Sequence, residues 1–246
     1  HIDFYFRDGS IRQYSLCSDP SDRRRYLIAI LRDEKGRGGS IALHDRLHVQ
    51  RKVFVGKPRN NFPIHKEAKH HLMIAGGIGV TPMLSMVYEL QNSGDDFTLH
   101  YCTKSSEHTA FQPELATLIE EGKVVVHHDQ GIPGNGLDIK KLLKKHKAGT
   151  HLYYCGPPGF MRALADLSSH WPEDTVHLEF FSAAASPKPT MTNEDIHNAA
   201  DGVVGIGFQV KIASTGASFA VPNNKTIVEV LAENGVNVEV SCSSGL

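Results

Sequence analysis

Along positions 67–181, short apolar runs typical of strands alternate with segments whose apolar residues have helical spacing. Short apolar runs predict strands over residues 71–75, 97–102, 123–128, 150–155 and 175–181. Apolar residues at helical spacing predict helices over residues 82–92, 111–121, 138–147 and 158–169. Strands that alternate with helices form a parallel sheet with right-handed crossovers, and such α/β sheets bind ligands at the carboxyl ends of their strands.

The first predicted strand of this sheet runs into a glycine-rich turn at residues 76–79 (Gly-Gly-Ile-Gly) and then into a helix. Thr81 is predicted to cap that helix, with Pro82 at its first position. Glycines let a ligand approach the backbone and a helix N-terminus offers free N–H groups, so a phosphate or pyrophosphate fits here. The turn departs from the G-x-G-x-x-G fingerprint, and glycines that serve packing alone are the alternative.

Two further strand ends of the same sheet carry residues that suit a ligand. They are residues 101–104 (Tyr-Cys-Thr-Lys) and 155–158 (Cys-Gly-Pro-Pro). Because the carboxyl ends of parallel strands lie at one edge of the sheet, the three loops are expected to form one site.

Residues 1–66 predict antiparallel strands. The apolar runs are 1–6, 11–16, 25–31 and 53–55, and a glycine-rich loop at 36–40 leads into a short helical pattern. The segment is short for a domain, so we expect the first strands of a barrel to be missing from it.

Residues 183–204 are rich in Ala, Ser, Pro, Thr and Asn and predict a linker. Beyond it, residues 208–212 and 218–221 predict a hairpin, and a capping box at 226–229 opens a helix that stops at Gly235. A small third domain is expected to begin here and to be incomplete.

Composition excludes several other classes of protein. The chain has 246 residues and a net charge of −1, which gives no reason to expect a nucleic acid or an anionic membrane as partner. No apolar run approaches the roughly 20 residues of a membrane span, and no signal peptide is recognised. The four scattered cysteines favour a reducing, cytoplasmic setting. Adjacent histidines such as His70 and His71 point to opposite faces of a strand, which argues against chelation of a metal.

A series of segments, in their order along the chain, resembles the reductase component of Rieske-type aromatic oxygenases, the phthalate dioxygenase reductase family. The segments are 12–15 (Arg-Gln-Tyr-Ser), 36–40 (Gly-Arg-Gly-Gly-Ser), 58–62 (Pro-Arg-Asn-Asn-Phe), 76–83, 155–157 and 242–246 (Cys-Ser-Ser-Gly-Leu). The resemblance implies a multidomain chain. Its parts would be an FMN-binding antiparallel β-barrel (1–66), an NAD-binding α/β domain (67–182), the linker, and part of a β-grasp 2Fe–2S ferredoxin domain (205–246).

The resemblance also implies which residues hold the flavin. Arg12 would bind the FMN phosphate, Tyr14 would lie against the isoalloxazine, and the Ser15 hydroxyl would bond near its N5 atom. Further residues implied in this site are Gln13, Ala29, Gly38, Gly39 and Ser40. Without the family, 12–15 is an ordinary strand and 36–40 a mobile loop.

For the nucleotide, the resemblance implies pyrophosphate contacts from Gly76, Gly77, Gly79, Thr81 and Pro82. Thr103 and Lys104 would lie near the adenosine ribose. No acidic residue stands at that strand end to read a 2′-hydroxyl, and Lys104 would tolerate a 2′-phosphate, so NADH is expected but NADPH stays open.

Cys155, Gly156 and Pro157 resemble the family's nicotinamide loop, and Phe181 matches the aromatic residue that stacks on the flavin. The resemblance thus implies three catalytic residues, which are Ser15, Cys155 and Phe181. A buried, inert cysteine and a core phenylalanine are the alternatives. Cys242 would be the first ligand of a plant-type C-x4-C-x2-C cluster, of which this chain supplies one of four thiolates. A lone surface cysteine is the alternative there.

The implied function is that of an NADH-dependent enzyme that passes electrons through FMN and a 2Fe–2S cluster to a separate Rieske-type oxygenase or demethylase component. Two alternatives remain from the sequence. One is a stand-alone NAD(P)H:flavin oxidoreductase, or diaphorase, and the other is a non-enzymatic electron carrier or binding module.

Overall fold

The chain divides into two compact units, His1–Ser182 and Ala183–Leu246. The computed structural model describes residues 1–6, 9, 11–36, 38–132, 134–181, 208–212, 215–222, 225 and 227–236. The predicted linker and Cys242 lie outside the described residues.

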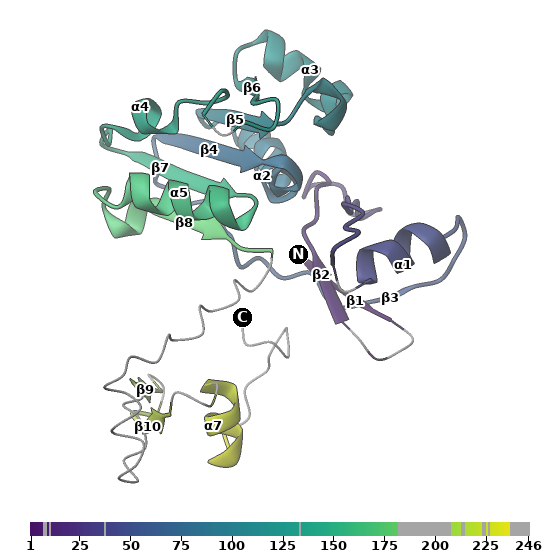
Figure 1. Ribbon diagram of the computed structural model, residues 1–246, viewed down its shortest axis with the longest axis vertical. Helices are drawn as coiled ribbons and strands as arrows, with labels where there is room; N and C mark the ends of the chain where they lie inside the picture. Colours follow the sequence, from purple (N-terminus) through teal and green to yellow (C-terminus); the bar gives the residue numbers. More distant parts are fainter. Residues whose placement is uncertain are drawn as a thin grey trace. The chain divides into compact units, whose positions relative to one another are not determined.

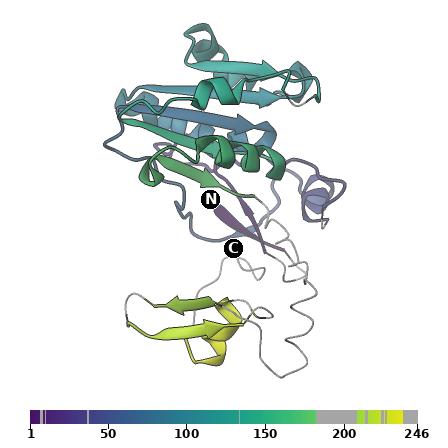
Figure 2. The ribbon, with the colours of Figure 1, turned by 60° about the vertical axis from the view of Figure 1, so that its left-hand side comes forward.

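The first unit is built around a parallel sheet of five strands in the order β6-β5-β4-β7-β8 (Figures 1 and 2). The strands are β4 (His70–Gly76), β5 (Phe97–Thr103), β6 (Val124–His128), β7 (Thr150–Cys155) and β8 (Val176–Glu179). Their apolar residues are buried on both faces of the central strands, which is why these strands read as continuous apolar runs. The predicted parallel sheet is confirmed.

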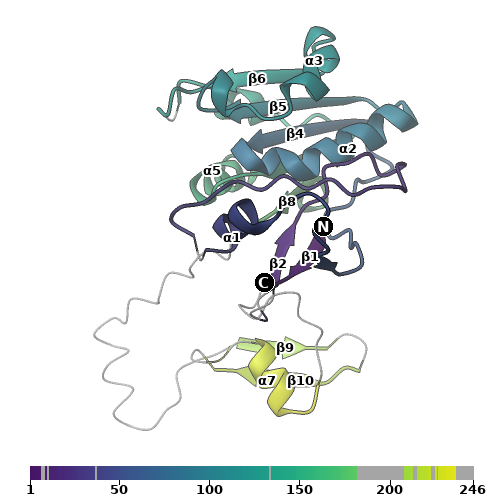
Figure 3. The same cartoon turned by 90° about the vertical axis from the view of Figure 1, so that its right-hand side faces the viewer.

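Helices cover both faces of this sheet (Figures 1 and 3). α2 (Val80–Ser93) and α3 (Gln112–Glu120) pack on one face, where α2 lies against β4 and β5 and α3 lies against β6. α4 (Ile139–Leu143) and α5 (Pro158–Ser168) pack on the other, against Leu72 and Ile74. Short 3-10 turns follow β4 (η1, Gly77–Gly79), follow β5 (η2, Ser106–His108) and precede β8 (η3, Glu173–Thr175).

Two predicted helix boundaries were wrong. η1 leads directly into α2, so the backbone is already helical at Gly79 and Thr81 is not the N-cap. The Thr81 hydroxyl instead donates to the Ile78 carbonyl at 3.0 Å, and Pro82 is the third residue of the helix. The helix predicted over 138–147 ends at Leu143. Lysines spaced four apart, at 140 and 144 and at 141 and 145, disfavour its continuation because like charges repel at that spacing.

The N-terminal part of the same unit forms a three-stranded antiparallel sheet in the order β2-β1-β3. Its elements are β1 (Ile2–Tyr5), β2 (Ile11–Tyr14), β3 (Phe54–Val55) and helix α1 (Gly39–Arg46). The strand predicted over 25–31 was wrong. Within the described residues, that segment pairs with one neighbour, through a single bridge from Leu16 to Ile28.

In the second unit, β9 (Phe208–Lys211) and β10 (Ser218–Val221) form the predicted antiparallel hairpin. Helix α7 (Ile227–Glu233) follows, and Gly235 takes a left-handed conformation just beyond it. Both predictions are confirmed, whereas Thr226 of the predicted capping box lies outside the described residues. No helix in the described ranges has the length and apolar character needed to cross a membrane.

A stack of histidines ties the segment before β4 to the parallel sheet. The His65 ring lies 4.3 Å from that of His151, which in turn lies 5.2 Å from that of His177 in β8. His151 Nδ1 and His177 Nε2 are 2.9 Å apart, so one of the two nitrogens carries a hydrogen and donates a hydrogen bond to the other. The Tyr153 hydroxyl also accepts a hydrogen bond from the His65 backbone N–H at 2.9 Å. The hydrogen bond between His151 and His177 requires at least one of these two rings to be neutral.

Two histidines, His177 of this stack and His100 of β5, predict that the fold is sensitive to mild acid. Burial, followed by the neighbouring His151 and His65, lowers the pKa of His177 to about 4. Burial and His127 do the same for the pKa of His100. Between pH 6.5 and 4 the unfolded chain therefore binds protons that the folded chain does not, and the free energy of unfolding falls as the pH falls.

We expect a loss on the order of 1–2 kcal/mol by pH 4.5, after discounting for the solvent-exposed part of both rings. This corresponds to a fall in Tm of roughly 5 °C, measurable by circular dichroism at a series of pH values. His177→Gln is expected to make Tm depend less steeply on pH between 6.5 and 4.5. His48→Gln, at an exposed site, serves as the control. An equal slope in the His177 variant would contradict the assignment.

Candidate active site

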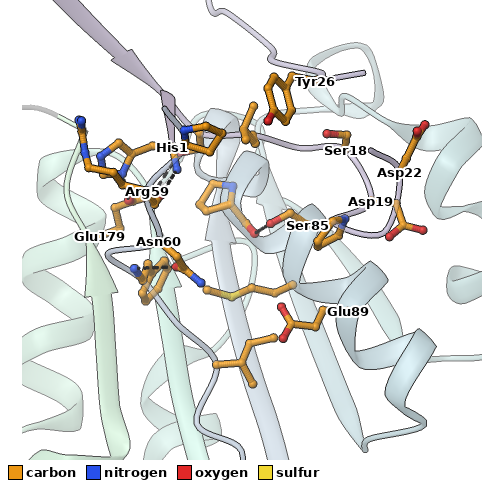
Figure 4. Close-up of a pocket in the computed structure, with 18 of the residues that line it drawn as sticks. His1, Ser18, Asp19, Asp22, Tyr26, Arg59, Asn60, Ser85, Glu89 and Glu179 are labelled. Carbon is orange, nitrogen blue, oxygen red and sulfur yellow. Dashed lines mark hydrogen bonds and ion pairs between the residues drawn. The ribbon is translucent and has the colours of Figure 1, made fainter. Parts of the chain in front are cut away.

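A cavity of about 570 Å³ lies where the antiparallel sheet meets the parallel sheet. Its walls come from the segment after β2, residues 58–64, the first turns of α2, and the end of β8. Figure 4 shows Arg59 and Glu179 at one end of the cavity, and Asp19 and Asp22 at the other. The cavity thus joins parts of the chain that are far apart in sequence.

At one end of this cavity, Ser15 and Glu179 meet. The Ser15 hydroxyl, which directly follows β2, donates a hydrogen bond to Glu179 Oε2 at 3.2 Å. Ser15 is a predicted site residue, and Glu179 is one that the sequence reasoning missed. The available signal was the position of an acidic residue at the carboxyl end of β8, level with Cys155 of β7. A hydroxyl and a carboxylate held together at a cavity wall can bind and orient a polar ring edge.

Cys155 lies behind this pair, in the core between β7 and α2. Its side chain is fully buried and is not among the residues that line the cavity. Burial, reinforced by the nearby Glu179 carboxylate, raises the pKa of the thiol well above its usual range, so the thiol is neutral. Phe181, in contrast, is 44% exposed just beyond β8 and is free to contact a ligand outside the core.

The glycines after β4 serve two different purposes. A Cβ atom added at Gly79 would overlap the Cys155 carbonyl oxygen and lie 2.8 Å from the Gly156 nitrogen, so Gly79 permits the close packing of α2 on β7. Gly77 has a φ of 54° and open space where a Cβ would point. Of the two, Gly77 is the position that leaves its backbone accessible to a phosphate. Gly76 and Gly156 pack against each other and against the Phe160 ring.

At the end of β5, Thr103 is engaged within the protein. It is buried, and its hydroxyl lies 2.8 Å from that of Thr109 and 2.9 Å from His128 Nδ1. Lys104 follows it and is exposed. Three residues further on, Glu107 is exposed in η2, an acidic residue that the sequence reasoning did not credit to this strand end.

The residues predicted to hold a flavin phosphate are brought together around the start of α1. The Arg12 side chain lies directly against Gly39, because a Cβ there would come 3.0 Å from Arg12 Nε. Gly38 takes a left-handed conformation and precedes the helix, whose first-turn N–H groups have no partner earlier in the helix. The Ser40 hydroxyl accepts a hydrogen bond from Asp33 N–H and so closes the loop. A guanidinium beside the first-turn amides of a helix suits a phosphate.

Other predicted flavin residues face different neighbours. Tyr14 is half-buried and meets the Phe4 ring edge-on at 6.4 Å. The Gln13 amide donates to Asp3, which also accepts a hydrogen bond from Arg59. Ala29 packs against the apolar core on the α2 face of the parallel sheet. Gln13 and Ala29 therefore contact other parts of the protein, while Tyr14 is half-buried and keeps part of its side chain accessible.

This fold and this site define the class of pyridine-nucleotide-linked oxidoreductases. Residues 57–173 match the family model described as dimethylamine monooxygenase subunit DmmA-like, N-terminal domain. The reductase subunit of tert-butanol monooxygenase / tert-amyl alcohol desaturase from Aquincola tertiaricarbonis is 54% identical over the whole chain and 72% of its own length. Phthalate dioxygenase reductase from Burkholderia cepacia is 42% identical, over 97% of this chain and 70% of that protein.

A solved structure gives the same result. Phthalate dioxygenase reductase, described as a modular structure for electron transfer from pyridine nucleotides to 2Fe–2S, matches with a TM-score of 0.73 and 40% identity. The match covers 99% of this chain and 72% of that one. The chain belongs to the phthalate dioxygenase reductase family of oxygenase reductase components, as its sequence motifs predicted.

Proposed function

We propose that the chain is the NADH-dependent reductase component of an oxygenase system, passing electrons from NADH through FMN and a 2Fe–2S cluster to its oxygenase. The observation that carries the proposal is the meeting of Ser15 and Glu179, which brings the antiparallel sheet into direct contact with the carboxyl end of β8. A nucleotide on the parallel sheet and a flavin on the antiparallel sheet would both reach this point.

For the nucleotide, we propose that the pyrophosphate lies on the backbone of Gly77 and the start of α2. The Val80 N–H is already bonded to the carbonyls of Gly77 and Ile78, so the donors would be the N–H groups of η1, and the positive end of the helix dipole favours an anion there. Gly156 and Pro157 would bound the nicotinamide on the β7 side. Cys155, because it is buried and neutral, would support this loop from behind.

For the flavin, the residues present fit a mononucleotide phosphate. Arg12 is an always-charged donor that rests on Gly39, and the amides at the start of α1 add further donors. When bound, FMN supplies the step from two-electron to one-electron transfer. The protein's share is orientation: Tyr14 and Phe181 would bound the ring, and Ser15 would donate to its edge while Glu179 holds that hydroxyl in place.

The finer domain assignments are part of the proposal. We propose that the β2-β1-β3 sheet belongs to an FMN-binding barrel over 1–66, and that 67–182 is the NAD-binding domain. The hairpin β9-β10 and α7 would begin a β-grasp ferredoxin domain over 205–246, with Cys242 as one cluster ligand. The three cysteines in the described residues are free thiols, which supports a reducing, cytoplasmic location.

The partner proposed is a Rieske-type oxygenase or demethylase component. The related systems are named for an aromatic compound, phthalate, in one case and for a non-aromatic one, tert-butanol, in another. A reductase that hands over electrons has no need to contact the compound that is oxidised. The aromatic substrate expected from the sequence therefore stays a prediction about the partner.

The proposal is tested by absorbance spectra of the purified full-length protein, before and after anaerobic NADH. We expect a flavin band and a broad iron–sulfur shoulder, both bleached by NADH. A flavin band alone would identify a diaphorase, and no chromophore at all would identify a binding module. Arg12→Ala is expected to raise the dissociation constant for FMN about 10- to 100-fold, as for loss of a charge-assisted hydrogen bond. Arg24→Ala, at an exposed position, should retain the band.

A further inference from the structure

A rigid acidic turn follows the second strand of the nucleotide-binding sheet. In dinucleotide-binding sheets of this kind, the adenosine ribose lies near the end of that strand, where a carboxylate accepts a hydrogen bond from its 2′-hydroxyl. Here the strand is β5, and the carboxylate nearest its end in the sequence is Glu107, in η2. A role for Glu107 in nucleotide binding rests on the proposed use of this sheet for a pyridine nucleotide.

Glu107 is held by its neighbours. The Ser105 hydroxyl donates to Glu107 Oε2 at 2.8 Å, and the same hydroxyl lies 2.8 Å from His108 Nδ1. A serine hydroxyl has one proton to give, so His108 Nδ1–H donates to Ser105 while Ser105 donates to the carboxylate. This chain of hydrogen bonds leaves Glu107 Oε1 without a partner in the described part of the protein.

Hydrogen bonds from buried Thr103 and from Gln112 hold the turn that carries Glu107. The buried Thr103 hydroxyl contacts the Ser105 carbonyl at 3.2 Å and the Thr109 hydroxyl at 2.8 Å. From the start of α3, the Gln112 amide donates to the Ser106 carbonyl at 2.7 Å. The carboxylate is therefore exposed but held on a braced backbone, which lowers the entropy lost when it binds a ligand.

We infer that Glu107, held by Ser105, is the residue that selects NADH over NADPH. Its free oxygen accepts a hydrogen bond from a ribose 2′-hydroxyl. A 2′-phosphate in the same place would bring its negative charge against the carboxylate. The exposed ammonium of Lys104 on the same strand end acts in the opposite sense and limits the preference. The structure thus adds the acidic residue that the sequence reasoning did not find at this strand end.

The test compares two ligands that differ in the 2′-phosphate alone. Binding of 5′-AMP and of adenosine 2′,5′-bisphosphate is measured by calorimetry on the full chain. We expect the wild type to bind 5′-AMP more tightly, and Glu107→Gln to narrow the ratio by about fivefold, as for loss of one exposed charge contact. Lys104→Gln should widen it. Glu120→Gln, which removes an equal charge from the exposed end of α3, is the control and should leave the ratio unchanged.

An unchanged ratio in Glu107→Gln would overturn the inference, and so would a wild type that prefers the bisphosphate or binds neither ligand at millimolar concentration. Reduction of the flavin by NADH is followed separately in each variant. A chain that discriminates between the two ligands as expected but does not oxidise NADH would support the role of Glu107 and contradict the proposed function.

Discussion

Replacing Gly79 by valine is expected to destabilise the whole nucleotide-binding sheet, not to weaken NADH binding alone. A Cβ atom at this position would overlap the backbone carbonyl of Cys155 and lie 2.8 Å from the Gly156 nitrogen. Both neighbours are backbone atoms of or next to β7, a central strand, so neither can move away as a flexible side chain would. The helix α2 must shift off the sheet instead.

We expect Gly79→Val to lower the free energy of unfolding by about 3 kcal/mol or more, at or above the upper end of overpacking effects. Denaturant unfolding followed by circular dichroism measures it. Gly77→Ala is the matched control, because its Cβ would meet open space and only the left-handed backbone is disfavoured. That variant should lose about 1–2 kcal/mol and stay folded.

Gly79→Val and Gly77→Ala together distinguish an effect on packing from an effect on ligand binding. Gly77→Ala places a methyl group on the proposed pyrophosphate surface, so it should raise the Michaelis constant for NADH while the flavin stays bound. A Gly79→Val protein as stable as the wild type would show that the contact of α2 with β7 is not as tight as the structure has it.

The parallel sheet was predictable because both of its signals are local. Residues 72–75 are apolar without interruption because β4 is covered on both faces, and the helices show their own period. The start of α2 was less predictable. Thr81 and Pro82 look like a cap and a first helical residue, but the glycines before them adopt a helical turn that sequence rules assign to a loop.

The candidate active site was predicted from the sequence only in part, since the contact on which the proposal rests is not local. Ser15 and Glu179 are 164 positions apart, and no pattern in either segment indicates that the two side chains meet. Glu107 was missed for a different reason. It follows β5 by four residues, outside the expected strand end, and the proposal that it serves that end rests on the 3-10 turn and the Ser105 contact that hold it.

Breaking the contact between Ser15 and Glu179 is expected to slow the reduction of the flavin by NADH. The hydrogen bond has a carboxylate acceptor and is partly buried at the wall of the cavity, and hydrogen bonds to charged groups contribute about 1.5–3 kcal/mol. Ser15→Ala and Glu179→Gln should each reduce the rate about 10- to 100-fold, measured by anaerobic stopped-flow absorbance. Flavin content should stay unchanged, because the phosphate cradle around Arg12 is untouched.

The double variant distinguishes a shared role from two separate ones. If Glu179 acts by holding the Ser15 hydroxyl, the loss in the double variant should be close to that of one single variant. Glu89→Gln removes a carboxylate that lines the same cavity from α2 and should leave the rate near that of the wild type. Fully additive losses would show that the two residues act independently, with Glu179 contacting the nucleotide or the flavin directly. Both outcomes test the contact between the two sheets, because the Ser15 hydroxyl directly follows β2 of the antiparallel sheet and the Glu179 carboxylate ends β8 of the parallel sheet.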